Sequence, residues 1–125
     1  MIVAVGVDAV EIARIERLLG RESERFEQRV FTAAEVTYCS ARPRPAESFA
    51  ARFAAKEAAL KCLGSGWADG AGFRQVEVVR RTSGDTDLTL HGAAAERAAA
   101  RGIRRWHVSL THTETTATAF VVAEA

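Results

Sequence analysis

The spacing of apolar side chains divides the chain into a first part with mostly helical periodicity and a second part in which strands dominate. The chain opens with an almost unbroken apolar run over residues 2–7, which is typical of a strand buried on both faces. Helical spacing follows, and we expect helices at about 10–19, 23–30, 33–40 and 46–63. Thr32 and Glu35 have the spacing of a capping box, which marks the start of the third of these helices.

Beyond residue 73 the pattern changes to short apolar runs separated by polar turns. We expect strands at 74–81 and 87–91, a helix at 92–101, and a final hairpin whose polar turn covers 111–115. This order predicts an α+β fold with a mainly antiparallel sheet packed with helices. Because no repeat, long linker or low-complexity tract interrupts it, we expect a single domain over residues 1–125.

Composition fits this picture and excludes some kinds of partner. A chain of 125 residues with 48% hydrophobic content can form one core. The net charge of +1, from 17 basic and 16 acidic residues, argues against a general nucleic-acid coat. No basic leader precedes an apolar stretch, and no apolar run approaches the roughly 18 residues of a membrane span. We therefore expect a cytoplasmic protein with neither a nucleic-acid nor a membrane partner.

The cysteines and two of the histidines indicate no chemistry of their own. Cys39 and Cys62 lack the spacing of a zinc site, so we expect buried, reduced thiols. His91 and His107 are interpreted as strand residues.

The helix expected at 46–63 places charged side chains where an amphipathic helix would have apolar ones. Phe53 and Leu60 lie on one apolar stripe of the helix, and Lys56 lies within that stripe. Glu57 and Lys61 lie along the edge of the stripe. This pattern alone leaves a structural explanation open, in which Lys56 snorkels to the solvent. In that explanation Glu57 and Lys61 form an i, i+4 ion pair worth about a few tenths of a kcal/mol.

The end of this helix favours a phosphate site. Gly64, Ser65 and Gly66 supply a glycine stop followed by flexible backbone whose N–H groups can turn toward an anion. With the lysines and Glu57, they indicate a phosphate held together with a divalent cation. Mg²⁺ prefers a few carboxylate oxygens shared with substrate phosphates, so a second acid is needed. Asp8, at the end of the first strand, is the candidate, although alone it is better explained as a cap or turn residue.

Three motifs occur along the chain. The first two are Gly6-Val7-Asp8 with Arg14, and Arg52-Phe53-Ala54-Ala55-Lys56-Glu57-Ala58 with Lys61. The third is Ser109-Leu110-Thr111-His112-Thr113, followed by Ala117 and Ala119. Together they resemble the motifs of the holo-[acyl-carrier-protein] synthases, the short class of 4'-phosphopantetheinyl transferases. The motifs occur in the order expected for that family, and the resemblance runs from residue 2 to about residue 122.

The resemblance implies a Mg²⁺-dependent reaction that moves the 4'-phosphopantetheine arm of coenzyme A onto a serine hydroxyl of apo acyl carrier protein. Adenosine 3',5'-bisphosphate would be released, and the product would serve fatty-acid or polyketide synthesis. Asp8 and Glu57 would hold the metal, and Lys61 would neutralise a non-bridging phosphate oxygen. Gly64, Ser65 and Gly66 would line the same phosphates. Either Glu57 or a metal-bound water would take the serine proton.

The resemblance also implies residues that bind the nucleotide of coenzyme A. Arg52 matches a basic residue of the family position for position, which implies contact with the 3'-phosphate. Arg44 matches more loosely, because Pro43 and Pro45 replace the usual lysine-rich spacing. His112 corresponds to a histidine beside the nucleotide. The alternatives are solvated surface arginines and a histidine that belongs only to the turn.

The helix expected at 10–19 carries a row of arginines that would suit an acidic carrier protein. Arg14 and Arg21 match arginines with which the family receives its carrier, and Arg25 would replace a basic residue that some relatives have at the position of Glu24. A basic stripe would steer an acidic partner and make association sensitive to salt. The alternative is a solvated charged face, partly neutralised by Glu11 and Glu16.

The resemblance further implies a homotrimer with its active sites at the subunit interfaces, to which the apolar C-terminal strand would contribute. Two other functions fit parts of the pattern. A non-catalytic carrier-protein or nucleotide-binding module would not need Asp8, Glu57 and Lys61 intact. A different Mg²⁺-dependent phosphoryl transferase finds no Walker loop or kinase motif in the sequence.

Overall fold

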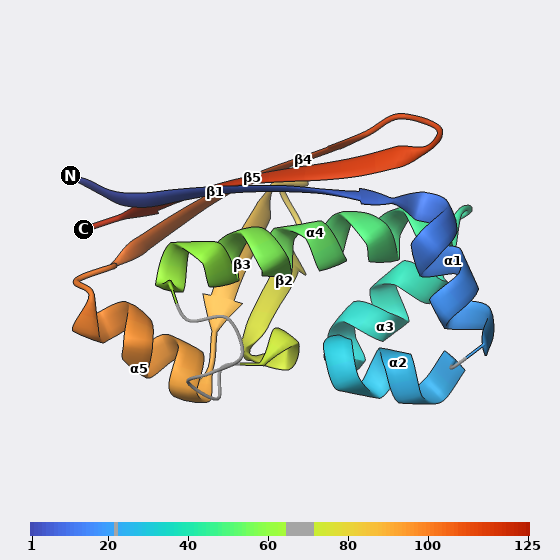
Figure 1. The fold of residues 1–125 in the computed structure, drawn as a ribbon, viewed down its shortest axis with the longest axis horizontal. Coiled ribbons are helices and arrows are strands. Elements are labelled where there is room, and N and C mark those ends of the chain that lie inside the picture. Colours follow the sequence, from blue (N-terminus) through green and yellow to red (C-terminus); the bar gives the residue numbers. More distant parts are fainter. Residues whose placement is uncertain (22, 65–71) are drawn as a thin grey trace.

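The computed structural model describes residues 1–21, 23–64 and 72–125, and within them the fold is α+β with antiparallel sheets, as expected (Figure 1). The described helices are α1 (Ile12–Arg21), α2 (Ser23–Val30), α3 (Ala33–Ser40), α4 (Pro45–Leu63) and α5 (Gly92–Ala100), with a 3₁₀ turn, η1, at Phe73–Gln75. The described strands are β1 (Ile2–Glu11), β2 (Val76–Arg80), β3 (Thr86–Leu90), β4 (Arg105–His112) and β5 (Thr116–Glu124).

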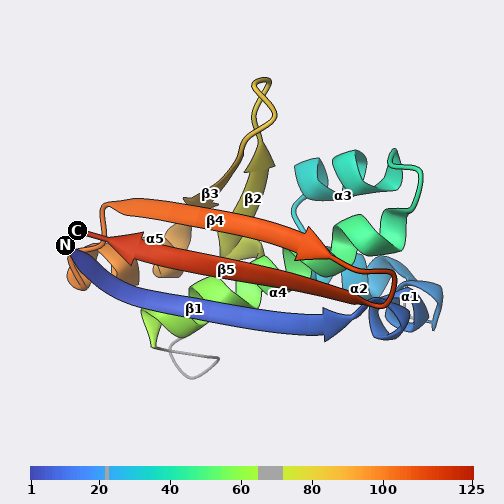
Figure 2. The ribbon, with the colours of Figure 1, turned by 90° about the horizontal axis from the view of Figure 1, so that it is seen from above.

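The strands form two sheets of different size. β1, β5 and β4 pair antiparallel in that order, so the last strand of the chain lies between the first strand and its own hairpin partner. β2 and β3 form a separate antiparallel pair that projects away from the long sheet (Figure 2). The expected C-terminal hairpin is present with its turn after His112.

Helix α4 lies between the three-stranded sheet and the remaining elements (Figure 1). It is therefore buried around most of its circumference, and its alanines at 50, 54, 55, 58 and 59 are fully buried. Small side chains let the sheet approach closely. At Gly6 of β1, a Cβ atom would stand 2.1 Å from the carbonyl oxygen of Ala58, so no side chain fits at this crossing. The single apolar stripe expected from the sequence understates this burial.

The expectation that the first strand is buried on both faces is wrong. β1 extends to Glu11, and it alternates between buried and exposed positions, with Val5 57% and Val7 55% exposed. The reason is that the helices that the structure describes all lie on one side of the sheet of β1, so its other face is uncovered by them (Figure 1). Ile2 and Phe120 are exposed large apolar side chains of the same sheet.

Several smaller expectations can be compared directly with the structure. Thr32 and Glu35 form the predicted capping box, and Cys39 and Cys62 are buried and free. His107 lies in β4 as expected, whereas His91 is not a strand residue and instead occupies the N-cap of α5. Among the described residues, no helix has the length and apolar character needed to cross a membrane.

Candidate active site

β1 and α4 bring Asp8 and Lys61 together. The Lys61 ammonium donates to Asp8 Oδ1 at 3.0 Å and to the carbonyl oxygen of Val7 at 2.9 Å. Asp8 is the more enclosed partner, since its side chain is 16% exposed and that of Lys61 is 55% exposed. The close crossing of β1 over α4 at Gly6 places Asp8 beside the helix. Such a solvent-facing pair contributes little to stability, so Lys61 can exchange Asp8 for another anion at low cost.

Glu57 lies close enough to Asp8 and Lys61 for their charges to influence its pKa. It is half-buried on α4, one helical turn before Lys61. Burial is the main cause that raises the pKa of Glu57, and the negative charge of Asp8 raises it further, while Lys61 and Arg14 oppose the shift. The ion pair described for Lys61 is with Asp8, which differs from the i, i+4 pair considered for the isolated helix. A half-buried carboxylate beside a second carboxylate is suited to binding a cation.

The donor set fits Mg²⁺ bound with a phosphate ligand. Mg²⁺ usually takes one or two protein carboxylates and completes its shell with water and substrate phosphates. Asp8 and Glu57 are two carboxylates of this kind; burial is the main cause that raises the pKa of Glu57, and the negative charge of Asp8, which a cation would offset, adds to it. Among residues 1–21, 23–64 and 72–125 there is no group of three or more potential His, Cys, Asp or Glu ligands. An all-protein metal cage is therefore not the arrangement that these residues provide.

Glu57 lies in the wall of a cavity of about 780 Å³ between α1, α2, α4 and η1. Its apolar surface includes Phe26, Phe53 and Phe73, and three arginines contribute positive charge: Arg14, Arg29 and Arg74. The cavity combines an apolar surface, cationic groups and a carboxylate of raised pKa. We refer to it as the Glu57 groove.

A second cavity, of about 530 Å³, contains the candidate nucleotide-binding residues. Arg44, Arg52 and His112 line it together with Tyr38 and Arg80, so α3, α4, β2 and β4 meet there. Arg52 is only 5% exposed, and its guanidinium carbon lies 4.4 Å from the centre of the Tyr38 ring. One Nη donates weakly to the carbonyl oxygen of Ser48 at 3.4 Å, while the buried Nε has no hydrogen-bond partner. A buried donor without a partner is costly, and the guanidinium that carries it lines this cavity, where an anion would be favoured.

Glu47 lies close to both Arg44 and His112, the two candidate nucleotide-binding residues other than Arg52. The sequence did not single out Glu47. Its carboxylate lies 2.8 Å from Arg44 Nη1 and 3.9 Å from His112 Nε2. Arg44 is the N-cap residue of α4, and Glu47 is three residues later in the first turn. The i, i+3 spacing would have predicted the pair with Arg44. The contact with His112 could not be predicted locally, because it depends on how the β4–β5 turn packs on α4.

Comparison with known proteins decides the family. The model of the 4'-phosphopantetheinyl transferase superfamily matches residues 4–120. The chain belongs to this superfamily. Its relatives include the holo-[acyl-carrier-protein] synthase of Koribacter versatilis, 44% identical over 124 residues and 99% of both chains. That of Methylobacterium sp. (strain 4-46) is 51% identical over 129 residues, covering 100% of this chain and 96% of the relative.

Solved structures agree with this assignment to the transferase superfamily. A crystal structure of the holo-[acyl-carrier-protein] synthase from Neisseria meningitidis matches with a TM-score of 0.90 and 33% identity, over 100% of both chains. The Helicobacter pylori synthase in complex with coenzyme A matches with a TM-score of 0.84 and 28% identity, over 97% of this chain and 100% of that chain. The resemblance read from the three motifs, to the holo-[acyl-carrier-protein] synthases, is thereby confirmed.

For this phosphopantetheinyl transferase, the expected phosphate-binding turn is described only at its start. Gly64 is the C-cap of α4 with a φ of 70°, a left-handed conformation that favours glycine. Ser65 and Gly66 lie outside the described residues.

Two arginines of the α5 region, unnoticed in the sequence, bind carbonyl oxygens at the end of α4. Arg97 Nε donates to Leu63 at 2.7 Å, and Arg101 donates to Cys62.

The arginines expected to receive a carrier protein lie on the surface of the transferase. Arg14 and Arg21 are exposed on α1, and Arg25 is exposed on α2. Arg14 also lines the Glu57 groove, where its charge lowers the pKa of Glu57. The structure thus places a basic surface beside one of the candidate catalytic carboxylates.

Proposed function

We propose that this protein transfers the 4'-phosphopantetheine group of coenzyme A to a serine hydroxyl of apo acyl carrier protein. The reaction would require Mg²⁺, release adenosine 3',5'-bisphosphate and supply fatty-acid or polyketide synthesis in the cytoplasm. The observation that carries the proposal is the convergence of Asp8, Glu57 and Lys61 at the crossing of β1 and α4. Relatives called holo-[acyl-carrier-protein] synthases cover at least 99% of the chain, and related structures are complexes with coenzyme A.

The chemistry requires charge neutralisation and in-line geometry. The serine oxygen attacks the β-phosphorus of coenzyme A, a new O–P bond forms, and the bond to the departing adenosine 3',5'-bisphosphate breaks. Mg²⁺ held by Asp8 and Glu57 would neutralise charge on the pyrophosphate oxygens. Lys61, exposed and bound to Asp8 in the free protein, would donate to a non-bridging oxygen. Glu57 or a metal-bound water would take the serine proton, and burial, followed by the charge of Asp8, raises the pKa of Glu57, which makes it a stronger base than an ordinary glutamate.

The proposal is tested by following the release of adenosine 3',5'-bisphosphate from coenzyme A. Chromatography should detect adenosine 3',5'-bisphosphate only when the protein, coenzyme A and an apo carrier protein are all present. A binding module would retain coenzyme A without releasing the bisphosphate. A different phosphoryl transferase would consume a nucleoside triphosphate and leave coenzyme A intact.

The second cavity is proposed to bind the nucleotide of coenzyme A through Arg44, Arg52 and His112. The support is strongest for Arg52, because this buried guanidinium has an Nε without a partner. Arg44 is exposed and paired with Glu47, so it could turn toward a phosphate after leaving that pair. We expect the 3'-phosphate of coenzyme A to bind in this cationic cavity.

Replacing Arg52 by glutamine is expected to raise the KM for coenzyme A by roughly 10- to 100-fold, since a hydrogen bond to a charged group is worth about 1.5–3 kcal/mol. The KM for 3'-dephospho-coenzyme A should change little, because the missing phosphate cannot lose a contact. Arg42→Gln is the matched control, since Arg42 lines the same cavity and also faces Tyr38. Equal losses with both substrates would contradict this role of Arg52.

The basic surface on α1 and α2 is proposed to receive the acidic carrier protein. Arg14, Arg21 and Arg25 are exposed there, and the groove beside Arg14 leads to Glu57. Electrostatic complementarity of this kind mainly increases the association rate and determines orientation. It would bring the acceptor serine toward Glu57 rather than toward the nucleotide cavity.

Reversing the charge of Arg21 is expected to raise the KM for the carrier protein by about 10-fold and to flatten its salt dependence. Arg21 is a cleaner choice than Arg14, because Arg14 also influences the pKa of Glu57. Arg104→Glu is the control, because it makes the same charge change on an exposed residue just before β4, outside α1 and α2. An unchanged carrier KM for Arg21→Glu, measured at low salt, would exclude this surface.

A homotrimer with active sites between subunits is also proposed. The uncovered face of the long sheet carries the exposed apolar side chains of Val5, Val7 and Phe120, which would favour association. Within one chain, the nucleotide-binding candidates and Glu57 line different cavities. A site completed by two subunits would allow one coenzyme A molecule to use both sets of residues.

A further inference from the structure

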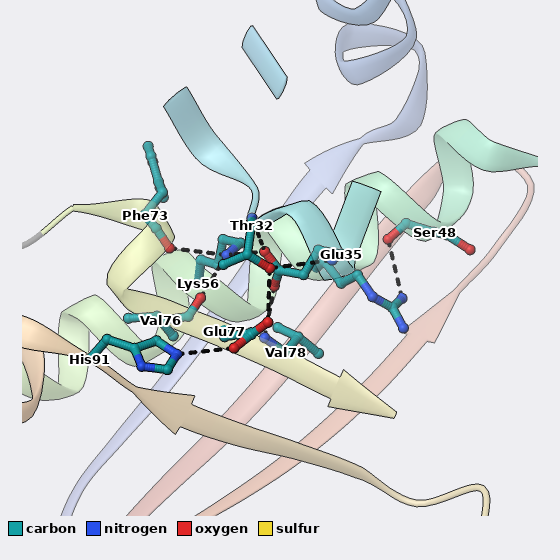
Figure 3. A network of polar contacts seen from close by, with 10 residues as sticks. Thr32, Glu35, Ser48, Lys56, Phe73, Val76, Glu77, Val78 and His91 are labelled. Atoms are coloured by element: carbon teal, nitrogen blue, oxygen red, sulfur yellow. Dashed lines mark hydrogen bonds and ion pairs between the residues drawn. The ribbon is translucent and has the colours of Figure 1, made fainter. Parts of the chain in front are cut away.

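Lys56 directly precedes Glu57 on α4, yet it faces the protein core. Its side chain is 0% exposed, which excludes the snorkelling arrangement considered from the sequence. Its ammonium group contacts Glu35 Oε1 at 2.7 Å and the carbonyl oxygens of Val76 at 2.6 Å and Phe73 at 3.0 Å (Figure 3). All three donors of the ammonium are therefore used within the protein. Lys56 is separated from any phosphate site by these contacts.

Glu35, the ionic partner of Lys56, also accepts hydrogen bonds from two backbone N–H groups. Its carboxylate accepts from the backbone N–H of Thr32 at 2.8 Å and from that of Val78 at 2.7 Å, in addition to Lys56 (Figure 3). The capping-box residue of α3 is thus also an anchor for β2. Together, Lys56 and Glu35 join α3 and α4 to the segment from η1 to β2. We call these two residues the buried pair.

The two carbonyl groups bound by Lys56 flank Arg74 and Gln75. Phe73, Arg74 and Gln75 form η1 and line the Glu57 groove, with Glu57 in the same lining. The backbone of this wall is therefore fastened to the helical residue next to Glu57. Without the ammonium, the carbonyl oxygens of Phe73 and Val76 would lose the donor that sets the position of η1 against α4.

Stability alone does not explain a buried ion pair of this kind. Removing two charges from water is costly, and replacement of such pairs by well-packed neutral residues is often neutral or stabilising. Burial lowers the pKa of Lys56 while Glu35 opposes the shift, which agrees with a strong desolvation cost. The pair does provide a fixed geometry, because an ammonium with three directed contacts allows a single placement of η1.

We propose that Lys56, held by Glu35, is a positioning residue for phosphopantetheine transfer, which fixes the η1 wall of the Glu57 groove relative to Glu57. This inference rests on the proposed function. It assigns Lys56 no contact with coenzyme A or with the phosphates. Loss of the pair should therefore impair the step that involves the carrier serine and leave the nucleotide cavity, lined by Arg44, Arg52 and His112, unaffected.

The test uses Lys56→Met/Glu35→Gln, which removes both buried charges and keeps an amide oxygen to accept from Val78. The double variant should fold, as judged by circular dichroism and a cooperative thermal transition. We expect kcat/KM for the carrier protein to fall at least 20-fold, with the KM for coenzyme A within twofold of wild type. A purely structural role would leave turnover per folded molecule unchanged.

Glu77→Gln is the matched control from the outer end of the same network. Glu77 accepts from Thr32 Oγ1 at 2.9 Å and contacts His91 at 3.0 Å, but these contacts do not involve the carbonyl groups of Phe73 and Val76 (Figure 3). The kcat/KM of Glu77→Gln for the carrier protein should stay within about twofold of wild type. Equal losses in the control and the double variant would overturn the inference.

Lys56→Gln is a second variant that keeps amide hydrogens for the two carbonyl groups, and it should lose less kcat/KM than the double variant. If the double variant does not fold, Lys56→Gln assayed at low temperature decides: a lower carrier kcat/KM with unchanged coenzyme A KM supports the inference. Wild-type kcat/KM in the folded double variant overturns it, as does wild-type kcat/KM in Lys56→Gln where the double variant does not fold. Absence of transfer by the wild-type protein would instead reject the proposed function.

Discussion

Replacing Glu57 by glutamine is expected to lower kcat by about 10²- to 10³-fold while the protein stays folded. The change removes a carboxylate that is proposed to hold Mg²⁺ and to accept the serine proton, and losses of this size are typical for one such group. Glutamine has nearly the same shape. Because burial and Asp8 both disfavour the ionised form of Glu57, a neutral amide should not reduce the melting temperature.

The comparison requires turnover and folding in the same preparations. Glu11→Gln is the control, since Glu11 is an exposed carboxylate at the end of β1. Both variants should show wild-type circular dichroism, and only Glu57→Gln should lose turnover. Turnover near the wild-type rate in Glu57→Gln would remove Glu57 from the catalytic site.

Asp8→Asn is expected to cause the second largest loss, about 10²-fold at low Mg²⁺, through weaker metal binding. Loss of supporting groups around a metal typically costs 10–100-fold in affinity, and removal of a direct ligand should cost at least about as much. Lys61 would also lose its charged partner, but that exposed pair contributes little to stability. The melting temperature should therefore change only slightly.

A Mg²⁺ titration separates the roles of the two carboxylates. Excess Mg²⁺ should partly restore turnover in Asp8→Asn, because its defect is one of metal affinity. It should not restore Glu57→Gln if Glu57 is also the base that takes the serine proton. Equal rescue of both variants would limit Glu57 to metal binding, and no shift of the Mg²⁺ dependence in Asp8→Asn would exclude Asp8 as a ligand.

The main elements of the fold could be predicted from the sequence because their signals are local. The capping box at Thr32 marked the start of α3, and Gly64 marked the end of α4. The short apolar runs on either side of the polar turn at 111–115 predicted the C-terminal hairpin. The burial of β1 was predicted wrongly, because an apolar run does not reveal whether the second face of its sheet is covered.

Local sequence patterns also predicted only part of the candidate site. Spacing on α4 identified Glu57 and Lys61, and the need of Mg²⁺ for a second acid pointed to Asp8, which on its own was better explained as a cap or turn residue. The role of Lys56 could not be read locally, because a lysine in an apolar stripe fits both a snorkelling side chain and a buried pair. Its partner, Glu35, lies on another helix, and its carbonyl ligands follow α4 in the chain. Glu47 and His112 likewise meet only after the hairpin packs on α4.

The most direct test is the intact mass of an apo acyl carrier protein after incubation with this protein, coenzyme A and Mg²⁺. The account predicts that the carrier gains the mass of one phosphopantetheine group, and that both omission of the protein and addition of EDTA prevent the gain. A carrier whose acceptor serine is replaced by alanine should stay unmodified. Unchanged masses for several verified apo carriers, with coenzyme A still bound by the folded protein, would contradict the account and favour a binding module.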